Sequence, residues 1–490
     1  MNANRPVDFL LDLETNSATP LYRQIYDQIR KGIVTGVLGA GERLPSIRRI
    51  AADHRISHIT VEQAYTQLAS EGFVRSIPRC GYVVEHLDAA YLQSPSIDNG
   101  EEVRKLGLAR SRDRFLEESA LGKGSRYDFS YANLQPDSFP VKTWRRIIND
   151  ILCRNTHEEL ARYWSTDEQG SLCKELARYL GQSRGVNCVP EQVILQPGTA
   201  EALGTILQLF NREDDVIGME EPGYATVGEV AKRLGFRMTP LPVDQGAQAF
   251  VSAVRSSNAK IVFLTPSHQF PTGSHLGLES RIEILKWAAE NAVFIIEDDS
   301  CCEYRHNTQP IPSLQSLDAH NRTIYLSNFS KALSPSMRMA YMVLPPELLG
   351  RYLNLYNYAH PSVPWLEQEA VARFIAEGHW EGHIRKMSLG NRKRNERIVD
   401  CLTKTMGSRI SIQGDATGMH LYVTVHNGMT QEELIESAAR HGARVYDTRR
   451  FWFSKPAPKG SVIIGYSSID IDDIQDGVNA LHAAWFGDSL

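Results

Sequence analysis

The sequence predicts an α/β protein in two parts: a small N-terminal helical domain and a large domain built on a mostly parallel sheet. The chain has 490 residues, which is too long for a single hydrophobic core. Beyond about residue 126, short apolar runs alternate with helical or loop segments, as in a parallel sheet covered on both faces. Residues 87–125 lack sustained periodicity. We therefore expect domains at 1–86 and 126–490, joined by a long linker at 87–125.

The composition is that of an ordinary globular protein, with 42% hydrophobic and 23% charged residues and a net charge of −5. This charge argues against a polyanion-binding surface over the whole molecule, so any nucleic-acid contact must come from a local patch. The seven cysteines show no CxxC spacing, which favours reduced thiols over disulfides or a zinc site. No run of 18 apolar residues and no secretory segment occur. We expect a cytoplasmic protein without a membrane span and without a metal.

The N-terminal domain shows signals for three helices and a hairpin. Apolar residues four apart over 20–35 indicate the first helix. Ser46 and Ser57 are suited to cap the second and third helices, and Gly72 is suited to end the third. Two short strands around residues 76–80 would form the hairpin. Three helices and a hairpin make a winged helix-turn-helix, which places its third helix in the major groove of DNA.

Basic and polar residues gather where DNA would lie. On the third helix, His58, Ile59, Thr60 and Gln63 point away from the apolar stripe. Arginines precede this helix and flank the hairpin, where phosphates would be met. A small helical domain with solvated arginines is the alternative. The predicted DNA-binding residues are Ser46, Arg48, Arg49, Ser57, His58, Thr60, Gln63, Arg75, Arg79 and Gly81.

In the large domain, a ligand is expected at the carboxyl ends of the parallel strands. The segment 198–200 opens a helix after one strand and offers backbone N–H groups to a phosphate. Tyr224 follows another strand and is suited to stack on a flat ring. Asp298 and Asp299 end a third strand, where a buried acid needs a cation. Lys331 follows the apolar run that ends at Leu326.

These residue types belong together in the chemistry of pyridoxal phosphate (PLP). A lysine amine attacks an aldehyde when it is deprotonated, and burial or nearby positive charge favours that form. An acid such as Asp298 keeps a pyridine nitrogen protonated. A phosphate needs an arginine, for which Arg338 is placed, and free backbone N–H groups.

Longer runs carry a resemblance to known families. Residues 44–51 and 60–72 resemble the GntR-type winged helix. The runs 265–273, 296–299 and 329–331 resemble a fold-type-I aminotransferase. From about residue 20 to 485, the whole chain is similar to the MocR (GabR-type) branch of GntR regulators.

The resemblance implies roles for individual residues. Lys331 would be the internal-aldimine lysine and Asp298 the partner of the pyridine nitrogen, although Asp299 is an open alternative. Tyr224 would stack on the ring and Arg338 would bind the phosphate. Lys331 is also the predicted catalytic residue. The predicted cofactor-binding residues are Lys331, Asp298, Tyr224, Arg338, Gly198, Thr199, Ala200, Ser330, His268 and Asn328.

The chain departs from the family's pattern at several positions. Ser300 stands where a tyrosine usually follows the Asp-Asp pair, and Asn328 stands where a small hydroxyl residue often touches the phosphate. His58 stands where the winged helix often has an arginine. The segment 462–466 lacks the arginine that aminotransferases often place there for a substrate carboxylate. The possible substitutes are Arg444, Arg449 and Arg450.

These observations favour a PLP-dependent, DNA-binding transcriptional regulator. Its expected partners are a double-stranded DNA operator and a small effector, which is an amine, an amino acid or PLP itself, sensed through an aldimine at Lys331. The resemblance implies a head-to-tail homodimer whose two heads read two half-sites. One alternative is an active aminotransferase with an appended DNA-binding module, so a role in turnover stays open. Another is a regulator whose PLP site has decayed.

Overall fold

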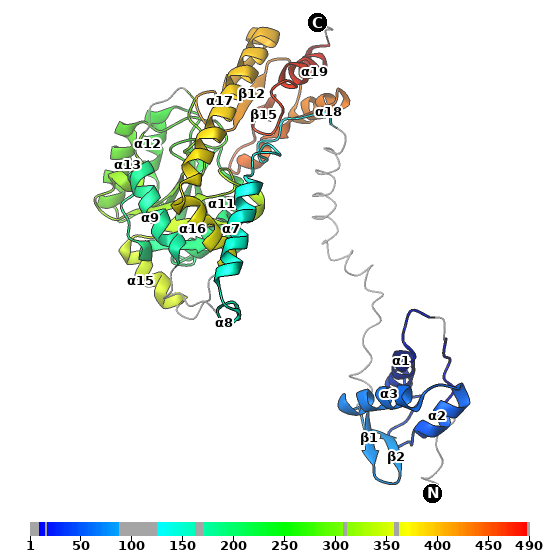
Figure 1. Ribbon diagram of the computed structural model, residues 1–490. Coiled ribbons are helices and arrows are strands. Elements are labelled where there is room, and N and C mark those ends of the chain that lie inside the picture. The colour runs from blue at the N-terminus through cyan, green and yellow to red at the C-terminus, as the bar shows by residue number, and fades with distance from the viewer. Residues whose placement is uncertain are drawn as a thin grey trace. The chain divides into compact units, whose positions relative to one another are not determined.

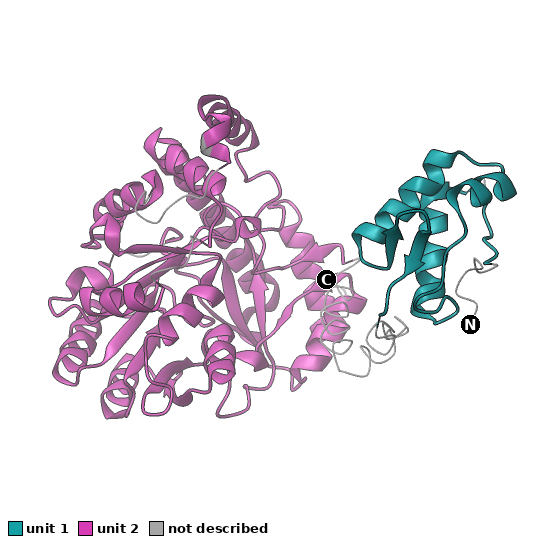
Figure 2. Cartoon of the chain, turned by 90° about the horizontal axis from the view of Figure 1, so that it is seen from below, with its two compact units in different colours: residues 1–118 teal, residues 119–490 magenta. Residues whose placement is uncertain are grey.

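The structure, a computed structural model, describes residues 9–14, 17–87, 125–161, 170–306, 311–356 and 362–487. Its contacts divide the chain into two compact units, residues 1–118 and 119–490 (Figure 2). The division falls within the predicted linker at 87–125. Most of that linker, 88–124, lies outside the described residues.

The N-terminal unit contains the predicted helices and hairpin (Figure 1). Ser46 and Ser57 act as the predicted N-caps: each side-chain oxygen accepts a bond of 3.2 Å from a backbone N–H in the following turn. These caps satisfy N–H groups that have no partner inside the helix. The elements are α1 (Leu21–Val34), α2 (Ile47–His54), α3 (His58–Ser70) and the antiparallel strands β1 (Val74–Ile77) and β2 (Gly81–Val84).

Helix α3 is held firmly in this unit. Its apolar stripe is fully buried and includes Val61 and Leu68. The Tyr65 hydroxyl donates to the Pro45 carbonyl at 2.8 Å, just before α2. The ring of Tyr65 meets the ring of Tyr82 in the hairpin edge to face, with centroids 5.0 Å apart. The side of α3 opposite this buried stripe therefore faces away from the core of the N-terminal unit.

The large unit is built on a seven-stranded sheet in the order β4-β10-β9-β8-β7-β5-β6. Neighbouring strands from β9 to β6 run parallel, whereas β10 runs antiparallel to both β4 and β9. The prediction of a mostly parallel sheet is confirmed. The strands are β4 (Val193–Gln196), β5 (Val216–Glu221), β6 (Arg237–Pro242), β7 (Ile261–Leu264), β8 (Phe294–Asp298), β9 (Thr323–Asn328) and β10 (Ala340–Val343).

Helices cover both faces of this sheet, which explains why its strands are apolar throughout. Neighbouring residues of one strand enter different cores: Tyr325 packs on one face, and Ile324 packs on the other. The α-helices around the sheet are α7 (Val141–Arg154), α8 (His157–Leu160), α9 (Ser171–Arg184), α10 (Thr199–Leu207), α11 (Ala225–Leu234), α12 (Ala247–Ser256), α13 (Leu278–Glu290), α14 (Leu314–Leu317), α15 (Pro346–Leu355) and α16 (Trp365–Ala376). The short 3-10 turns are η2 (Pro190–Gln192) and η3 (Pro335–Met337).

A second, smaller sheet follows near the C-terminus, in the order β11-β12-β15-β14 and antiparallel throughout. The segment that enters the large unit packs here as well, because β3 (Tyr127–Asp128) pairs in parallel with β13 (Ala443–Arg444). The remaining elements are α17 (His379–Met406), η4 (Gly407–Arg409), β11 (Ile410–Gln413), β12 (His420–Val425), α18 (Gln431–Arg440), β14 (Tyr446–Asp447), η5 (Arg449–Phe451), β15 (Ser461–Gly465) and α19 (Ile474–Phe486).

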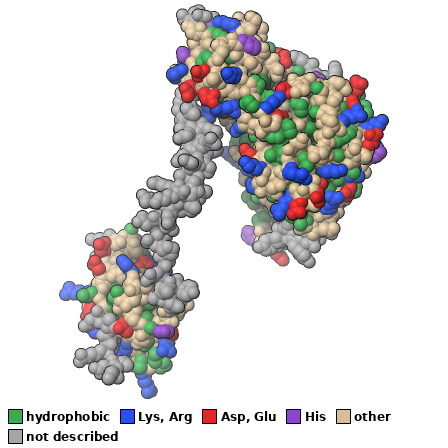
Figure 3. Space-filling view, turned by 180° about the vertical axis from the view of Figure 1, so that it is seen from behind, with side chains coloured by type: hydrophobic (Ala, Val, Ile, Leu, Met, Phe, Trp, Pro, Cys, Tyr) green, Lys and Arg blue, Asp and Glu red, His purple; other side chains and the backbone are tan. Residues whose placement is uncertain are grey.

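One face of the large unit shows no single dominant charge. On the face seen in Figure 3, basic and acidic side chains are interspersed over the large unit. This matches the expectation that a polyanion would be met only by a local patch. Among the described residues, none of the helices combines the length and the hydrophobicity that a bilayer-crossing segment needs.

Candidate cofactor site and DNA-binding surface

A cavity of about 370 Å³ lies where the carboxyl ends of β5, β7, β8 and β9 meet. Its wall is completed by residues 131–132, near the start of the large unit, and by residues 419–420 and 450–451 of the C-terminal part. The predicted cofactor-binding residues that line it are Lys331, Asp298, Tyr224, Thr199, His268 and Asn328. The others, Arg338, Gly198, Ala200 and Ser330, lie outside its lining.

Lys331 follows β9 and directs its amine into this cavity. Its Nζ donates to the carbonyl oxygens of Tyr131 at 3.1 Å and Ala132 at 3.2 Å. Burial lowers the pKa of Lys331 from its usual value, although the neighbouring Cys301 thiol acts in the opposite direction. A lysine with a lowered pKa has more of its amine in the nucleophilic, deprotonated form.

Asp298 ends β8 at the cavity. Burial raises the pKa of Asp298 to about 6, although hydrogen bonds from Ser300 favour the ionised form. The Ser300 backbone N–H donates to Oδ1 of Asp298 at 3.0 Å, and the Ser300 hydroxyl donates to the same oxygen. A cationic ring nitrogen beside this carboxylate would offset the cost of its burial.

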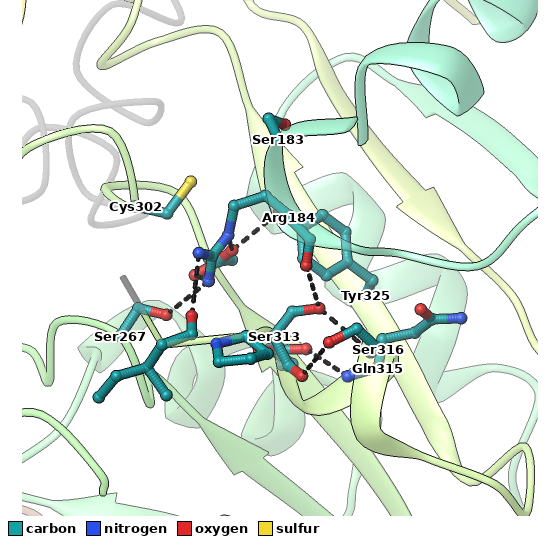
Figure 4. A network of polar contacts seen from close by, with 12 residues as sticks. Ser183, Arg184, Ser267, Cys302, Ser313, Gln315, Ser316 and Tyr325 are labelled. Carbon is teal, nitrogen blue, oxygen red and sulfur yellow. Dashed lines mark hydrogen bonds and ion pairs between the residues drawn. The ribbon is translucent and has the colours of Figure 1, made fainter. Parts of the chain in front are cut away.

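Asp299 already forms an internal ion pair with Arg184, the arginine labelled within the polar network of Figure 4. Arg184 donates to it from Nε at 2.6 Å and from Nη2 at 3.3 Å, and the Tyr325 hydroxyl donates to it at 2.9 Å. Burial alone would lower the pKa of Arg184, but the opposing effects of Asp299, Cys302 and Tyr325 together raise it. Of the two adjacent acids, Asp298 is therefore the better candidate for a ring nitrogen.

The expected phosphate seat has the predicted local form. Gly198 has a φ of 133° and precedes the first residue of α10. This positive φ favours glycine, and a Cβ at this position would lie against the movable guanidinium of Arg338. Arg338 also approaches Glu201 at 3.7 Å, between side chains that are 59% and 50% exposed. Such an exposed contact is weak, so Arg338 can turn to an anion with little loss.

Two of the departures from the family pattern contact each other. The Asn328 side-chain amide donates to the Ser300 hydroxyl at 2.7 Å and to the Thr199 hydroxyl at 3.1 Å. Since Ser300 in turn donates to Asp298, one chain of hydrogen bonds joins the acid to the phosphate seat. The oxygen of the same amide accepts from the Ser330 backbone N–H at 2.9 Å.

His268 offers a buried acceptor to the cavity. Its Nδ1 lies 2.8 Å from the Thr417 hydroxyl, which itself donates to the Gly273 carbonyl at 3.2 Å. When the hydroxyl proton serves that carbonyl, Nδ1 carries the imidazole proton and Nε2 keeps its lone pair. Burial lowers the pKa of His268, which keeps the ring neutral. Among the described residues, its Nε2 is buried with no hydrogen-bond partner.

Sequence reasoning named only one residue of the wall that comes from the C-terminal part of the chain. Of the three arginines named as carboxylate partners, Arg450 lines the cavity, with its guanidinium 5.8 Å from the centre of the Tyr131 ring. Arg444 instead approaches Asp128 at 3.8 Å, and Arg449 donates to Asp447 at 2.7 Å. The other missed lining residues include Tyr131, Ala132, Phe270, Met419, His420 and Phe451. Phe270 falls within the run 265–273, whereas the others stand where neither strand-end position nor motif marks them.

On the N-terminal unit, the predicted DNA-binding residues lie mostly in the open. Arg48, Arg49, His58, Gln63, Arg75 and Arg79 are exposed, and Thr60 is partly buried. Ser46 and Ser57 serve as helix caps and are also exposed. Gly81 and Arg79 have φ values of 91° and 66°, which turn the hairpin. Because the φ at position 81 is positive, this position favours glycine.

Comparisons with known proteins agree with both halves. Residues 21–84 match the model of the gntR family of bacterial regulatory proteins, and residues 129–462 match aminotransferase class I and II. The HTH-type transcriptional regulator YdeL of Bacillus subtilis is 35% identical, over 95% of this chain and 97% of that protein. The probable rhizopine catabolism regulatory protein MocR of Rhizobium meliloti is 31% identical, over 97% of this chain and 96% of that protein.

Solved structures show the same fold in the large unit. The kynurenine aminotransferase of Pyrococcus horikoshii matches with a TM-score of 0.67 at 21% identity, over 81% of this chain and 96% of that chain. LysN, the α-aminoadipate aminotransferase of Thermus thermophilus, matches with a TM-score of 0.67 at 24% identity, over 75% of this chain and 94% of that chain.

The fold and the cavity thus define a transcriptional regulator with an aminotransferase-like domain. The chain belongs to the GntR family of bacterial regulatory proteins, among the MocR-type regulators that carry an aminotransferase class I and II domain.

That domain belongs to a PLP-dependent family, and the residues present fit this cofactor. The cavity contains a buried amine at Lys331 and an acid at Asp298, and the unpartnered Nε2 of His268 is an acceptor without a donor. Arg338 lies close to Gly198, and its guanidinium and the backbone N–H groups after Gly198 would hold an anion. This donor set meets each polar part of PLP.

Replacing Asp298 by asparagine is expected to stabilise the PLP-free protein at neutral pH. The folded-state pKa of about 6 exceeds the unfolded value of about 3.9, so ionised Asp298 costs stability above pH 6 and nothing below about pH 4. We expect the free energy of unfolding of Asp298→Asn to exceed that of the wild type by roughly 2 kcal/mol at pH 7. Denaturant unfolding at both pH values measures this difference.

The matched control is Asp400→Asn, whose side chain is 44% exposed. It should change stability little at either pH. A gain from Asp298→Asn that persists at pH 4, or no gain at pH 7, would contradict the assigned burial of this carboxyl.

Proposed function

We propose that this regulator senses an amine, an amino acid or PLP at Lys331 and reports it through its DNA-binding unit. The observation that supports this most directly is the placement of the Lys331 amine. This amine lies in a cavity large enough for a small ligand. Burial lowers the pKa of the amine, and Asp298 lines the same cavity.

Different residues are expected to bind different parts of the cofactor. PLP, when bound, supplies an aldehyde that condenses reversibly with primary amines. We infer that Lys331 makes the covalent link, Asp298 holds the proton on the ring nitrogen and Tyr224 flanks the ring. The backbone N–H groups after Gly198 and the guanidinium of Arg338 would hold the phosphate.

The cavity also gives an effector a way to act on the rest of the large unit, because the wall joins the sheet to the C-terminal part. Buried Glu221 at the end of β5 accepts hydrogen bonds of 2.6 Å from the backbone N–H groups of Phe453 and Ser454. This contact positions the loop that carries Arg450. An effector that contacts both sides binds open and closed arrangements unequally, which is the requirement for coupling to DNA binding.

The remaining part of the proposal is assembly. We infer a homodimer, arranged head to tail, in which two N-terminal units read two half-sites of an operator. Sedimentation of the purified protein with and without a selected duplex measures the stoichiometry. A 1:1 complex of monomer and duplex would contradict this arrangement.

A spectral titration tests the sensing step. Purified protein loaded with PLP is titrated with a panel of amines and amino acids, and its visible absorption and its affinity for a selected duplex are recorded. We expect a subset of the panel to change both. If amines shift the absorption and no compound changes DNA affinity, sensing is excluded, and steady turnover with a keto acid would then favour an aminotransferase.

Replacing Arg48 by alanine is expected to weaken binding to all DNA sequences alike. Arg48 is exposed on α2, and of the two contacts that the resemblance implies for it, a phosphate or a base edge, we infer the phosphate. Losing one phosphate contact lowers the slope of log K against log salt by about 0.9. Binding titrations between low and moderate salt measure this slope. Arg23→Ala on α1, also exposed, is the control and should leave the slope unchanged.

A further inference from the structure

Helix α3 presents an unusual outward face for a helix that reads DNA. Its buried stripe, which includes Val61 and Leu68, fixes the residues near its N-terminus outward. The sequence of α3, HITVEQAYTQLAS, contains no lysine and no arginine. The basic residues of this surface, such as Arg48 and Arg75, lie on α2 and the hairpin. The basic residues and the outward face of α3 therefore belong to different elements.

Ile59 is the apolar member of that outward face. It is 66% exposed, although isoleucine is a residue that proteins usually bury. Its backbone N–H donates to the Ser57 side chain at 3.2 Å, which fixes it in the first turn of α3. Isolated exposed apolar residues are ordinary on a protein surface. What sets Ile59 apart is its place, because the N-terminal residues of this helix face the base edges in the major groove.

The major groove offers one apolar group that such a side chain fits, the 5-methyl group of thymine. Guanine is read most often by arginine or lysine, and α3 carries neither. We propose that Ile59 is a specificity-determining residue that contacts a thymine methyl group in each half-site of the operator. This inference rests on the proposed DNA binding by the N-terminal unit.

The test compares thymine with deoxyuridine, which lacks the methyl group and keeps every hydrogen-bonding atom. Full-length protein loaded with PLP first selects duplexes from a randomised library. Each thymine of the selected duplex is then replaced singly by deoxyuridine. We expect wild-type protein to bind about three- to fivefold more weakly at one thymine per half-site, the loss that one buried methyl group produces. Ile59→Ala should bind the thymine and deoxyuridine duplexes equally.

Val37→Ala is the matched control, because Val37 is also 66% exposed but lies outside α3. It should retain the full deoxyuridine penalty, as should Ile59→Val, which keeps a branched apolar side chain. The inference is overturned if no thymine is methyl-sensitive, or if Ile59→Ala keeps the penalty. It is also overturned if Ile59→Ala loses its fold by circular dichroism, since Ile59 would then be structural. Failure of the wild type to bind any duplex would instead reject DNA binding itself.

Discussion

Lys331→Ala is expected to abolish covalent attachment of PLP to the protein. The wild type, treated with PLP and then borohydride, should yield a labelled peptide containing Lys331, and the variant should yield none. The physical reason is that Lys331 places its amine in the cavity, beside the carbonyl oxygens of Tyr131 and Ala132, where burial lowers the pKa of this amine. Peptide mapping by mass spectrometry and the visible absorption of bound PLP measure the outcome.

The same variant separates sensing from DNA binding. The N-terminal unit has its own hydrophobic core, so Lys331→Ala should still bind DNA and should lose its response to amines. Lys286→Ala is the control, because its side chain is 76% exposed and lies on α13. If label persists in Lys331→Ala, or if the wild type takes up no label at this residue, the proposed sensing site is wrong.

Asp299→Asn is expected to destabilise the large unit by about 3–5 kcal/mol, the usual cost of breaking a buried ion pair. The side chains of Arg184 and Asp299 are 5% and 0% exposed, so the variant would leave a buried guanidinium without its counter-charge (Figure 4). The thermal transition of the large unit measures the loss. The neighbouring variant Asp298→Asn is expected to change stability in the opposite direction at pH 7.

A double variant provides the control for this ion pair. Arg184→Met removes the buried charge, so adding it to Asp299→Asn should recover part of the lost stability. If the two losses simply add, or if Asp299→Asn is as stable as the wild type, the pair is not the structural element described above. PLP retention by the double variant shows whether Asp299 also supports the cofactor.

Local signals in the sequence were sufficient to predict much of the architecture. The caps at Ser46 and Ser57, the glycine after α3 and the apolar stripe depend on residues within one or two helical turns, and the structure confirms them. The apolar runs predicted most strands of the large sheet, because a strand buried on both faces must be apolar throughout. β6 was missed, since its residues are largely only half-buried. The strand-end rule also placed Lys331, Asp298 and Tyr224 at one cavity.

The sequence by itself therefore determined the two kinds of fold and the residue types of the proposed cofactor site. Only the tertiary structure decided between neighbours and between distant segments. Asp298 and Asp299 are indistinguishable in a motif, and the buried Arg184, brought from the end of α9, separates them. Arg450 reaches the cavity while Arg444 and Arg449 pair elsewhere. Such outcomes depend on which side chains long-range packing brings within a few ångströms, and no local pattern encodes that.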